Sequence, residues 1–316
     1  MAEYMMREPA AVPLVVDLDG TLIHSDLLWE SILIFIKVRF LQLWRLPFWL
    51  LRGKAGFKEK IASMVELDPA ALPYDKILLA ELMLQRAQGR LIVLATGSQR
   101  RFADLVAGHL GLFGKVLATE GGINLTSHNK AAQLKDAFGN KGFDYIGNAS
   151  VDIAVWNASN DAFSVTRKPF RLAGGLITQS AGTPRTGWWA PLLKAMRPRQ
   201  WLKNLLVFVP MLAGHALNLD AFVQALVAFA AFSLCASSAY LLNDALDAAD
   251  DRRHPVKCHR PIASGKLPLP VAMLASPLLA LAALALCAVF DPLLLLVVVV
   301  YFITTLAYSI QLKRML

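Results

Sequence analysis

The chain has 316 residues, a mean hydropathy of +0.48, a formal net charge of +9 and 17% charged residues. It is too long for one ordinary domain and too apolar for a protein that is soluble throughout, so we expect a soluble part joined to a membrane part. The positive charge matches a protein held against anionic membrane lipids, and no nucleic acid is needed as a partner to explain it.

The first element, PLVVDLDGTL at residues 13–22, is typical of a short buried strand that ends in a Gly-Thr turn. Side chains of a strand repeat every second residue, so Asp17 and Asp19 emerge on the same side. Two carboxylates placed in this way suit a nucleophile paired with a general acid and base. We therefore predict Asp17 and Asp19 as catalytic residues.

An insertion follows between Asp26 and Ala71, where we expect a cap over about residues 26–75. Its segment 30–54 is apolar and aromatic but carries Lys37, Arg39 and Arg45, which makes a buried membrane span costly. We interpret it as a helix, broken near Pro47, that lies on the cytoplasmic leaflet. Alternatively, it forms the inner face of a helical cap.

Three further segments predict more of an α/β domain. RLIVLATGS at 90–98 is strand-like and ends in Thr96, HNKAAQLKDAFG at 128–139 begins a helix near Lys130, and FDYIGNASVDIAVW at 143–156 predicts a strand ending at Asn148, with Asp152 just beyond it. Alternating strands and helices indicate a parallel sheet, whose ligands bind at the carboxyl ends of the strands.

These residues resemble the haloacid dehalogenase-like phosphatase superfamily over about residues 10–165. The resemblance implies a Rossmann-like fold with a helical cap, in which Asp17 is the phosphate-accepting nucleophile and Asp19 the acid and base. It also implies phosphate binding by Thr96 and Lys130, and Mg²⁺ held by Asp17, Asp19 and Asp152. The family often has Asp where this chain has Asn148, which weakens the magnesium site, and a fold kept only as a scaffold is the alternative.

The stretch 171–189 is rich in Gly, Thr and small residues and predicts a linker, so we divide the chain into a phosphatase domain (1–170), a linker (171–196) and a membrane domain (197–316). Long apolar runs then predict four spans, of which the first is short for a bilayer. These spans are 203–216, 219–242, 267–290 and 293–311.

The basic residues predict the orientation of these spans. The loop after the second span carries five Lys or Arg residues and the fourth span ends in KR, whereas the turns 214–220 and 290–292 carry none. By the positive-inside rule, the N-terminal domain and the charged loop face the cytoplasm of a multi-pass cell-membrane protein. Arg197, Arg199 and Lys203 stand just before the first span, either as membrane anchors or as an anion seat.

The second span ends in an acidic cluster. If it stays helical through Asp251, then Asn243, Asp244, Asp247 and Asp251 lie within roughly 100° of one face, with Asp250 beside them. Carboxylates so close repel one another unless a divalent cation neutralises them, and oxygen ligands favour Mg²⁺. The alternative is a solvated helix end whose aspartates pair with neighbouring bases.

NDALDAADDRRHPVKCHRPIASG, together with RPRQWLKNLLVFVP, resembles the UbiA-type membrane transferase superfamily, and most of all its decaprenyl-phosphate phosphoribosyltransferase-like branch. The resemblance implies an all-α membrane domain, with phosphoribosyl diphosphate as donor and a polyprenyl phosphate as acceptor. It places magnesium on Asn243, Asp244, Asp247 and Asp251. It assigns phosphate binding to Lys203, Lys257 and Arg260.

The superfamily has more spans and a second aspartate motif in a later loop, so we expect a truncated chain or a fragment that completes its site with a partner, which includes self-association. The sequence thus predicts a two-module enzyme of polyprenyl-phosphate sugar metabolism. One alternative is a prenyltransferase that moves a prenyl group from its diphosphate to an aromatic acceptor. Another is a non-catalytic, membrane-anchored phosphatase fragment.

Overall fold

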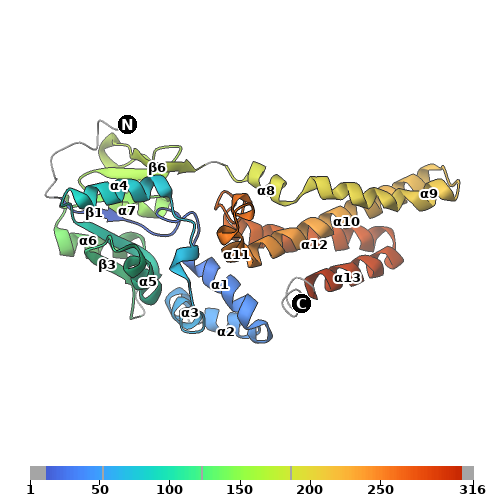
Figure 1. Ribbon diagram of the computed structural model, residues 1–316, viewed down its shortest axis with the longest axis horizontal. Coiled ribbons are helices and arrows are strands. Elements are labelled where there is room, and N and C mark those ends of the chain that lie inside the picture. Colours follow the sequence, from blue (N-terminus) through green and yellow to red (C-terminus); the bar gives the residue numbers. More distant parts are fainter. Residues whose placement is uncertain (1–11, 52, 122–123, 186, 308–316) are drawn as a thin grey trace. The chain divides into compact units, whose positions relative to one another are not determined.

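Six parallel strands organise the N-terminal part of the computed structural model, which describes residues 12–51, 53–121, 124–185 and 187–307 (Figure 1). Their spatial order is β3-β2-β1-β4-β5-β6, and residues 1–186 form one unit. This confirms the predicted α/β architecture with a parallel sheet. The strands are β1 (Leu14–Val16), β2 (Ile92–Gln99), β3 (Lys115–Thr119), β4 (Asp144–Gly147), β5 (Ala162–Thr166) and β6 (Gln179–Arg185).

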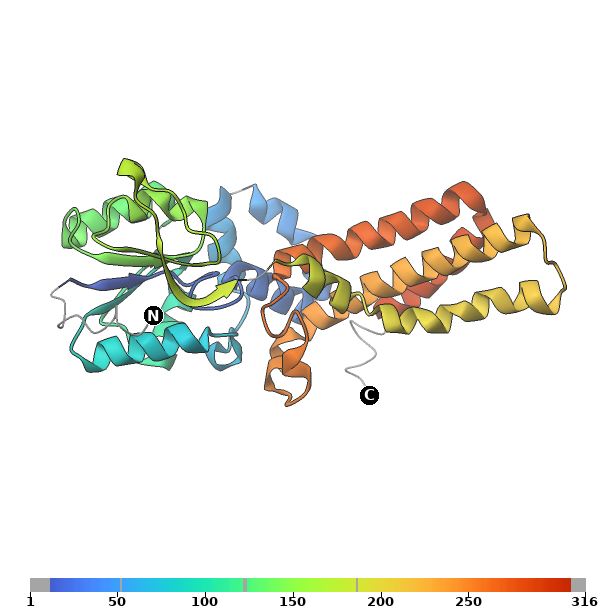
Figure 2. The ribbon, with the colours of Figure 1, turned by 90° about the horizontal axis from the view of Figure 1, so that it is seen from above.

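Alternation along β1 builds two hydrophobic layers. Leu14 and Val16 belong to a core with helices α4 (Lys76–Ala87) and α5 (Arg100–Leu110), whereas Val15 belongs to a core with α6 (Ser127–Phe138) and α7 (Ile153–Trp156). Figure 2 shows helices above and below the strands. Because all three strand residues are buried, β1 is fully internal and delivers the residues that follow it to one edge of the sheet.

The insertion after β1 is helical. It consists of α1 (Leu27–Val38), η1 (Phe40–Gln42), α2 (Arg45–Leu50), α3 (Gly53–Ala62) and η2 (Pro69–Ala71). The helix was predicted to break near Pro47, but α1 ends earlier, where Arg39 leaves the helical region with φ −130°. Pro47 lies in the first turn of α2, where a missing N–H costs no helical hydrogen bond.

The predicted linker needs correction. Residues 179–185 are β6, which pairs in parallel with β5 at the edge of the sheet, and residues 189–195 are helix α8. The small residues that indicated a linker suit an edge strand with an irregular register, and Gly182 adopts φ +59° there. Thr183 is fixed by Asp75, whose carboxylate accepts from its N–H and its hydroxyl, both at 2.8 Å.

The second unit, residues 187–316, is helical wherever it has regular structure in the described part. Two helices are long and apolar enough to cross a membrane, Leu219–Leu246 and Leu269–Phe290, judged by length and composition. Four predicted spans are therefore not confirmed. Its elements are α8 (Trp189–Ala195), η5 (Pro198–Phe208), α9 (Val209–Ala213), α10 (Leu219–Leu246), α11 (Ala248–Arg253), η6 (Lys257–His259), α12 (Leu269–Phe290) and α13 (Pro292–Ala307).

The first predicted span is 3₁₀-helical up to Phe208, followed by the five-residue α9, and the fourth is described only as far as residue 307. Helices α10 and α12 pack through small residues such as Ala231 and Ala283, which allow a close approach. Ser276 on α12 donates a hydrogen bond to the carbonyl of Ser238 at 2.9 Å, tying the two helices together.

Candidate functional site

Asp17 lies at the carboxyl end of β1 in a buried chain of polar contacts. Lys130 on α6 donates to Asp17 Oδ1 at 2.7 Å and to the Tyr145 hydroxyl at 2.9 Å. That hydroxyl donates to Asp152 Oδ1 at 2.8 Å. The fold thus joins the predicted site residue Asp17 to Lys130 and Asp152, which lie more than a hundred positions later in the sequence.

Asp152 is held rigidly by its local backbone. Its Oδ2 accepts from the N–H groups of Asn148 and Ala149, at 3.1 and 3.2 Å, where β4 turns into a short 3₁₀ helix. A Cβ on Gly147 would lie 2.7 Å from Asp152 Oδ2, so only glycine fits beside this carboxylate. Asn148 contributes its backbone here, and the structure gives its side chain no role in the site.

Asp19 lies in a separate nest of donors. Its Oδ1 accepts from the N–H of Leu27, the first residue of α1, at 2.7 Å. Its Oδ2 accepts from the hydroxyls of Ser98 and, at 3.3 Å, Thr96. The turn that separates Asp19 from α1 requires glycine, because Gly20 adopts φ +79°. Asp19 therefore meets the predicted phosphate binder Thr96 at the edge of the sheet.

The electrostatics of this edge reflect buried charge. Burial raises the pKa of Asp17 to about 6, with Lys130 opposing the effect and Asp152 adding to it. Burial, together with nearby Asp26, raises the pKa of Asp19 to about 6. Burial also disfavours the charge on Lys130, but Asp17 and Asp152 outweigh it and raise the pKa of that ammonium.

The donor set fits magnesium in its chemistry. Asp17, Asp19 and Asp152 offer carboxylate oxygens, which are ligands that magnesium prefers. Among the described residues, no three carboxylate, imidazole or thiolate groups converge on one point. Lys130 lies between Asp17 and Asp152 instead, 3.8 Å from the latter.

Sequence reasoning missed three contributors. Ser98 and Tyr145 complete the contacts described above, and Lys58 on α3 donates to the carbonyl of Gly97 at 2.6 Å and to Asn124 Oδ1 at 3.1 Å. Burial lowers the pKa of Lys58. Ser98 lies two residues after Thr96 on the same strand, so the two side chains share a face, and this spacing could have predicted Ser98 as a site residue. Nothing local in the sequence identified Lys58, which reaches the sheet from the insertion.

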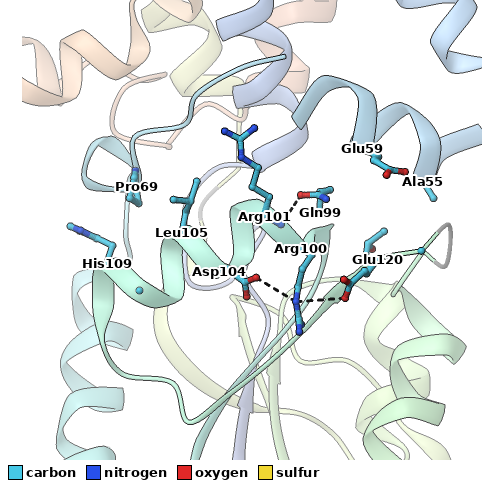
Figure 3. A pocket seen from close by; sticks show the side chains of 13 residues that line it. Ala55, Glu59, Pro69, Gln99, Arg100, Arg101, Asp104, Leu105, His109 and Glu120 are labelled. Atoms are coloured by element: carbon cyan, nitrogen blue, oxygen red, sulfur yellow. Dashed lines mark hydrogen bonds and ion pairs between the residues drawn. The ribbon is translucent and has the colours of Figure 1, made fainter. Parts of the chain in front are cut away.

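A cavity of about 940 Å³ lies beside this site, between α3, η2, α5 and the end of β3 (Figure 3). Arg100 crosses it to Asp104 at 3.4 Å and Glu120 at 3.7 Å. Asp17, Asp19 and Lys130 do not line it. Gln99, which follows Ser98 on β2, lines this cavity, as does Thr119, whose hydroxyl donates to the carbonyl of Gly97 at 2.8 Å.

The acidic cluster of the second unit lies where α10 gives way to α11. Asn243 and Asp244 end α10, Asp247 is the junction, and Asp251 lies on α11. Hydrogen bonds from Asp247 N to Asn243 O and from Asp251 N to Asp247 O, at 2.9 and 2.8 Å, preserve the helical spacing across the junction. Asn243 to Asp251 therefore keep nearly the geometry assumed from the sequence.

Two guanidinium groups hold these carboxylates. Arg197 NH2 donates to both oxygens of Asp244, at 2.6 and 2.9 Å, and Arg260 NH1 donates to Asp244 at 3.1 Å and to Asp251 at 2.7 Å. Arg197 has φ +55° just before Pro198, an unfavourable backbone for a residue other than glycine. Its guanidinium also stacks on Tyr240, 4.7 Å from the ring centre. As the side chains stand, arginines pair with Asp244 and Asp251, and no group of three acidic side chains among the described residues converges to hold a metal.

Comparison with known proteins assigns the second unit. Residues 205–316 match the UbiA prenyltransferase family. The C-terminal part of this chain is a UbiA-family domain. The "Decaprenyl-phosphate phosphoribosyltransferase" of Mycolicibacterium smegmatis is 42% identical over 140 residues, which are 43% of this chain and 44% of that protein. The predicted resemblance to the UbiA superfamily is confirmed.

Two further similarities cover other parts of the chain. The "Uncharacterized protein y4nM" of Sinorhizobium fredii is 34% identical over 313 residues, 96% of this chain and 60% of that protein. This chain thus spans less than two thirds of either relative. The crystal structure of a "predicted phosphoglycolate phosphatase" from Haemophilus somnus matches 48% of this chain and 84% of its own chain, at 16% sequence identity and a TM-score of 0.35. The assignment of the N-terminal unit rests on its own sheet order and side chains.

Of the three phosphate-binding residues predicted in the UbiA domain and the segment just before it, only one contacts the acidic cluster in the contacts described here. Arg260 joins the acidic cluster, whereas Lys203 is exposed on η5 and Lys257 is partly exposed on η6. Trp201 and Asn204 on η5 instead donate to serine hydroxyls of α10, each at 3.0 Å. Arg197, considered from the sequence as an anchor or anion ligand, is the cation that η5 presents to the cluster.

Proposed function

We propose that the N-terminal unit is a magnesium-dependent phosphomonoesterase of the haloacid dehalogenase type. The observation that carries this proposal is the buried Lys130–Asp17 ion pair at the carboxyl end of β1, with Asp19 and Asp152 beside it. Lys130 Nζ and Asp17 Oδ1 are 2.7 Å apart, so a phosphate group that reaches the carboxylate can also contact the ammonium.

In the proposed reaction, a carboxylate oxygen of Asp17 bonds to phosphorus while the ester oxygen leaves with a proton from Asp19. Water then attacks the phosphorus, passes its proton to Asp19 and releases phosphate and Asp17. The Lys130 ammonium balances the charge of the phosphoryl oxygens, the Thr96 hydroxyl donates a hydrogen bond to them, and Tyr145 positions Lys130 and Asp152. Magnesium held by Asp17, Asp19 and Asp152 would draw further charge from these oxygens.

The test is phosphate release from p-nitrophenyl phosphate and ribose 5-phosphate by the full chain with Mg²⁺. Asp17→Asn should reduce the rate by at least about a hundredfold, because an amide cannot form the acyl phosphate. Asp136→Asn, on the exposed face of α6, is the matched control and should leave the rate unchanged. Equal rates for wild type and Asp17→Asn would refute the role of Asp17.

We further propose that the UbiA domain contributes to phosphoribosyl transfer from phosphoribosyl diphosphate to a polyprenyl phosphate at the cytoplasmic face of the cell membrane. The 42% identity to a protein named decaprenyl-phosphate phosphoribosyltransferase favours this donor over a prenyl diphosphate. Such transfer leaves a phosphate on C5 of the ribose, so a phosphatase in the same chain has a chemically suitable substrate. Magnesium binding by Asn243, Asp244, Asp247 and Asp251 stays a prediction.

Incubating membranes that contain the protein with labelled phosphoribosyl diphosphate or labelled prenyl diphosphate separates the alternatives. The proposal expects label in a lipid fraction from phosphoribosyl diphosphate only. Label transferred from prenyl diphosphate to an aromatic acceptor would favour the prenyltransferase alternative. Transfer from neither donor, with phosphatase activity retained, would favour the membrane-anchored phosphatase.

A further inference from the structure

The insertion forms an elbow of α1, η1 and α2 whose inner side is well packed. Phe35 and Trp49 are buried against each other, with their ring centres 5.4 Å apart in an edge-to-face arrangement. Leu43 and Leu46 are partly buried against the same core, and Phe57 of α3 is buried in it. This inner side attaches the elbow firmly to the N-terminal unit.

The outer side of the elbow is equally apolar but has no protein partner among the described residues of its unit. Leu41, Trp44, Phe48 and Leu51 recur every three or four residues and are 81, 63, 61 and 85% exposed. A helix that is hydrophobic all round is normally buried on all sides. The elbow uses one side internally, so its outer stripe (Leu41, Trp44, Phe48 and Leu51) indicates an external apolar partner.

Charge identifies the chemistry of that partner. Between Ser31 and Phe57 the sequence contains five basic residues and no Asp or Glu. The guanidinium of Arg45 stacks over the exposed Trp44, 5.3 Å from the ring centre. Aromatic and aliphatic side chains flanked by bases are typical of segments that lie in the interface of an anionic membrane. The five bases are Lys37, Arg39, Arg45, Arg52 and Lys54.

Two further observations favour lipid over protein. Residues 205–316 match the UbiA prenyltransferase family, and two helices are long and apolar enough to cross a membrane, so a membrane-inserted second unit would tether the N-terminal unit to a bilayer. Two copies paired through this stripe would bring their basic segments together, and like charges without compensating acids oppose such contact.

The elbow is also connected to the candidate catalytic site. Asp26 caps α1 by accepting from Leu28 and Trp29, and the N–H of Leu27 donates to Asp19. We propose that the outer stripe inserts into the headgroup layer of an anionic bilayer, and that the phosphatase substrate is a phosphate carried by a membrane lipid. The second half of this proposal rests on the phosphatase activity proposed above, whereas the insertion does not.

Spin labels in the full chain test the insertion directly. Phe48→Cys and the control Gln133→Cys, on the exposed face of α6, are labelled in a Cys258→Ser background and placed in nanodiscs of phosphatidylcholine and phosphatidylglycerol. The label at 48 should be accessible to oxygen and shielded from an aqueous nickel chelate, and the label at 133 the reverse. Equal nickel access at both positions, or shielding of position 48 from both reagents by a protein contact, would overturn the insertion.

A charge-insertion variant tests the substrate class. Trp44→Glu/Phe48→Glu/Leu51→Glu should lower hydrolysis of a long-chain alkyl phosphate in the same lipid mixture at least tenfold and leave hydrolysis of p-nitrophenyl phosphate unchanged. Ile77→Glu, at an exposed apolar residue of α4, is the control and should change neither rate. An equal loss on both substrates, or no loss on either, would overturn the proposal. If wild type hydrolyses neither substrate, the phosphatase proposal fails while the spin-label result still decides the insertion.

Discussion

Asp75 is a buried carboxylate that we expect to hold β6 on the sheet. It caps α4 by accepting from the N–H groups of Ile77 and Leu78, at 3.0 and 3.1 Å, and it accepts from both donors of Thr183. Removing the cap costs about 1 kcal/mol. Leaving the Thr183 N–H without an acceptor costs about 1–3 kcal/mol. We therefore expect Asp75→Ala to destabilise β6 locally by about 2–4 kcal/mol.

Hydrogen exchange on the full chain in detergent measures this effect. A loss of about 2–4 kcal/mol makes the amides of residues 179–185 exchange roughly 30- to 700-fold faster. Asp75→Asn keeps a carbonyl oxygen for the cap but points an N–H₂ group at Thr183, so it should free β6 while sparing the start of α4. Asp68→Ala, which removes an exposed cap from η2, is the control and should leave β6 unchanged.

The pH dependence gives an independent check. Burial acts to raise the pKa of Asp75, but hydrogen bonds from Thr183 and Leu78, with His24 nearby, outweigh it and lower the pKa below 3.8. A depressed folded-state pKa means that the stabilisation is complete above the unfolded pKa and is lost as pH falls through the folded one. Protection of β6, corrected for intrinsic exchange, should be constant from pH 7 to 5 and decline below 3.8. Exchange in Asp75→Ala within threefold of wild type at pH 7 would refute this reasoning.

Two further predictions concern the sites. Gly147→Ala should lower phosphatase activity at least about tenfold, because the added Cβ would lie 2.7 Å from Asp152 Oδ2. Gly108→Ala is the control and should retain full activity, because its Cβ would meet nothing within 4 Å. Equal rates in the two variants would contradict the steric argument. Arg197→Ala and Asp244→Ala should each lower the Tm in detergent, with a coupling of about 1–3 kcal/mol in the double variant, and strictly additive losses would show that their bidentate contact contributes nothing.

Several features of the candidate site were predictable because they depend on local periodicity. Two aspartates two residues apart after a buried strand, and a strand ending near Thr96, were enough to predict a parallel sheet with polar groups at its carboxyl edge. The position of Lys130 near the start of a helix also agrees with the structure. In the second unit, the apolar runs predicted both long helices, and one-sided spacing anticipated the acidic cluster.

The linker prediction failed for a physical reason. Residues 179–185 have the small, polar composition of a loop, and what makes them a strand is pairing with β5 and the buried carboxylate of Asp75, about a hundred positions earlier. Neither contact can be predicted from the local amino-acid composition. The same holds for Lys58, whose long side chain reaches from the insertion to the carbonyl of Gly97.

By itself, the sequence determined the division into a charged α/β part and an apolar helical part, because periodicity and hydropathy are local properties. It also determined the residue types of both candidate sites. Only the tertiary structure decided which partner each charge takes: Lys130 for Asp17, and Arg197 and Arg260 for Asp244. A buried charge is stabilised by whichever opposite charge the fold brings within a few ångströms, and that distance is set by the packing of elements far apart in the chain.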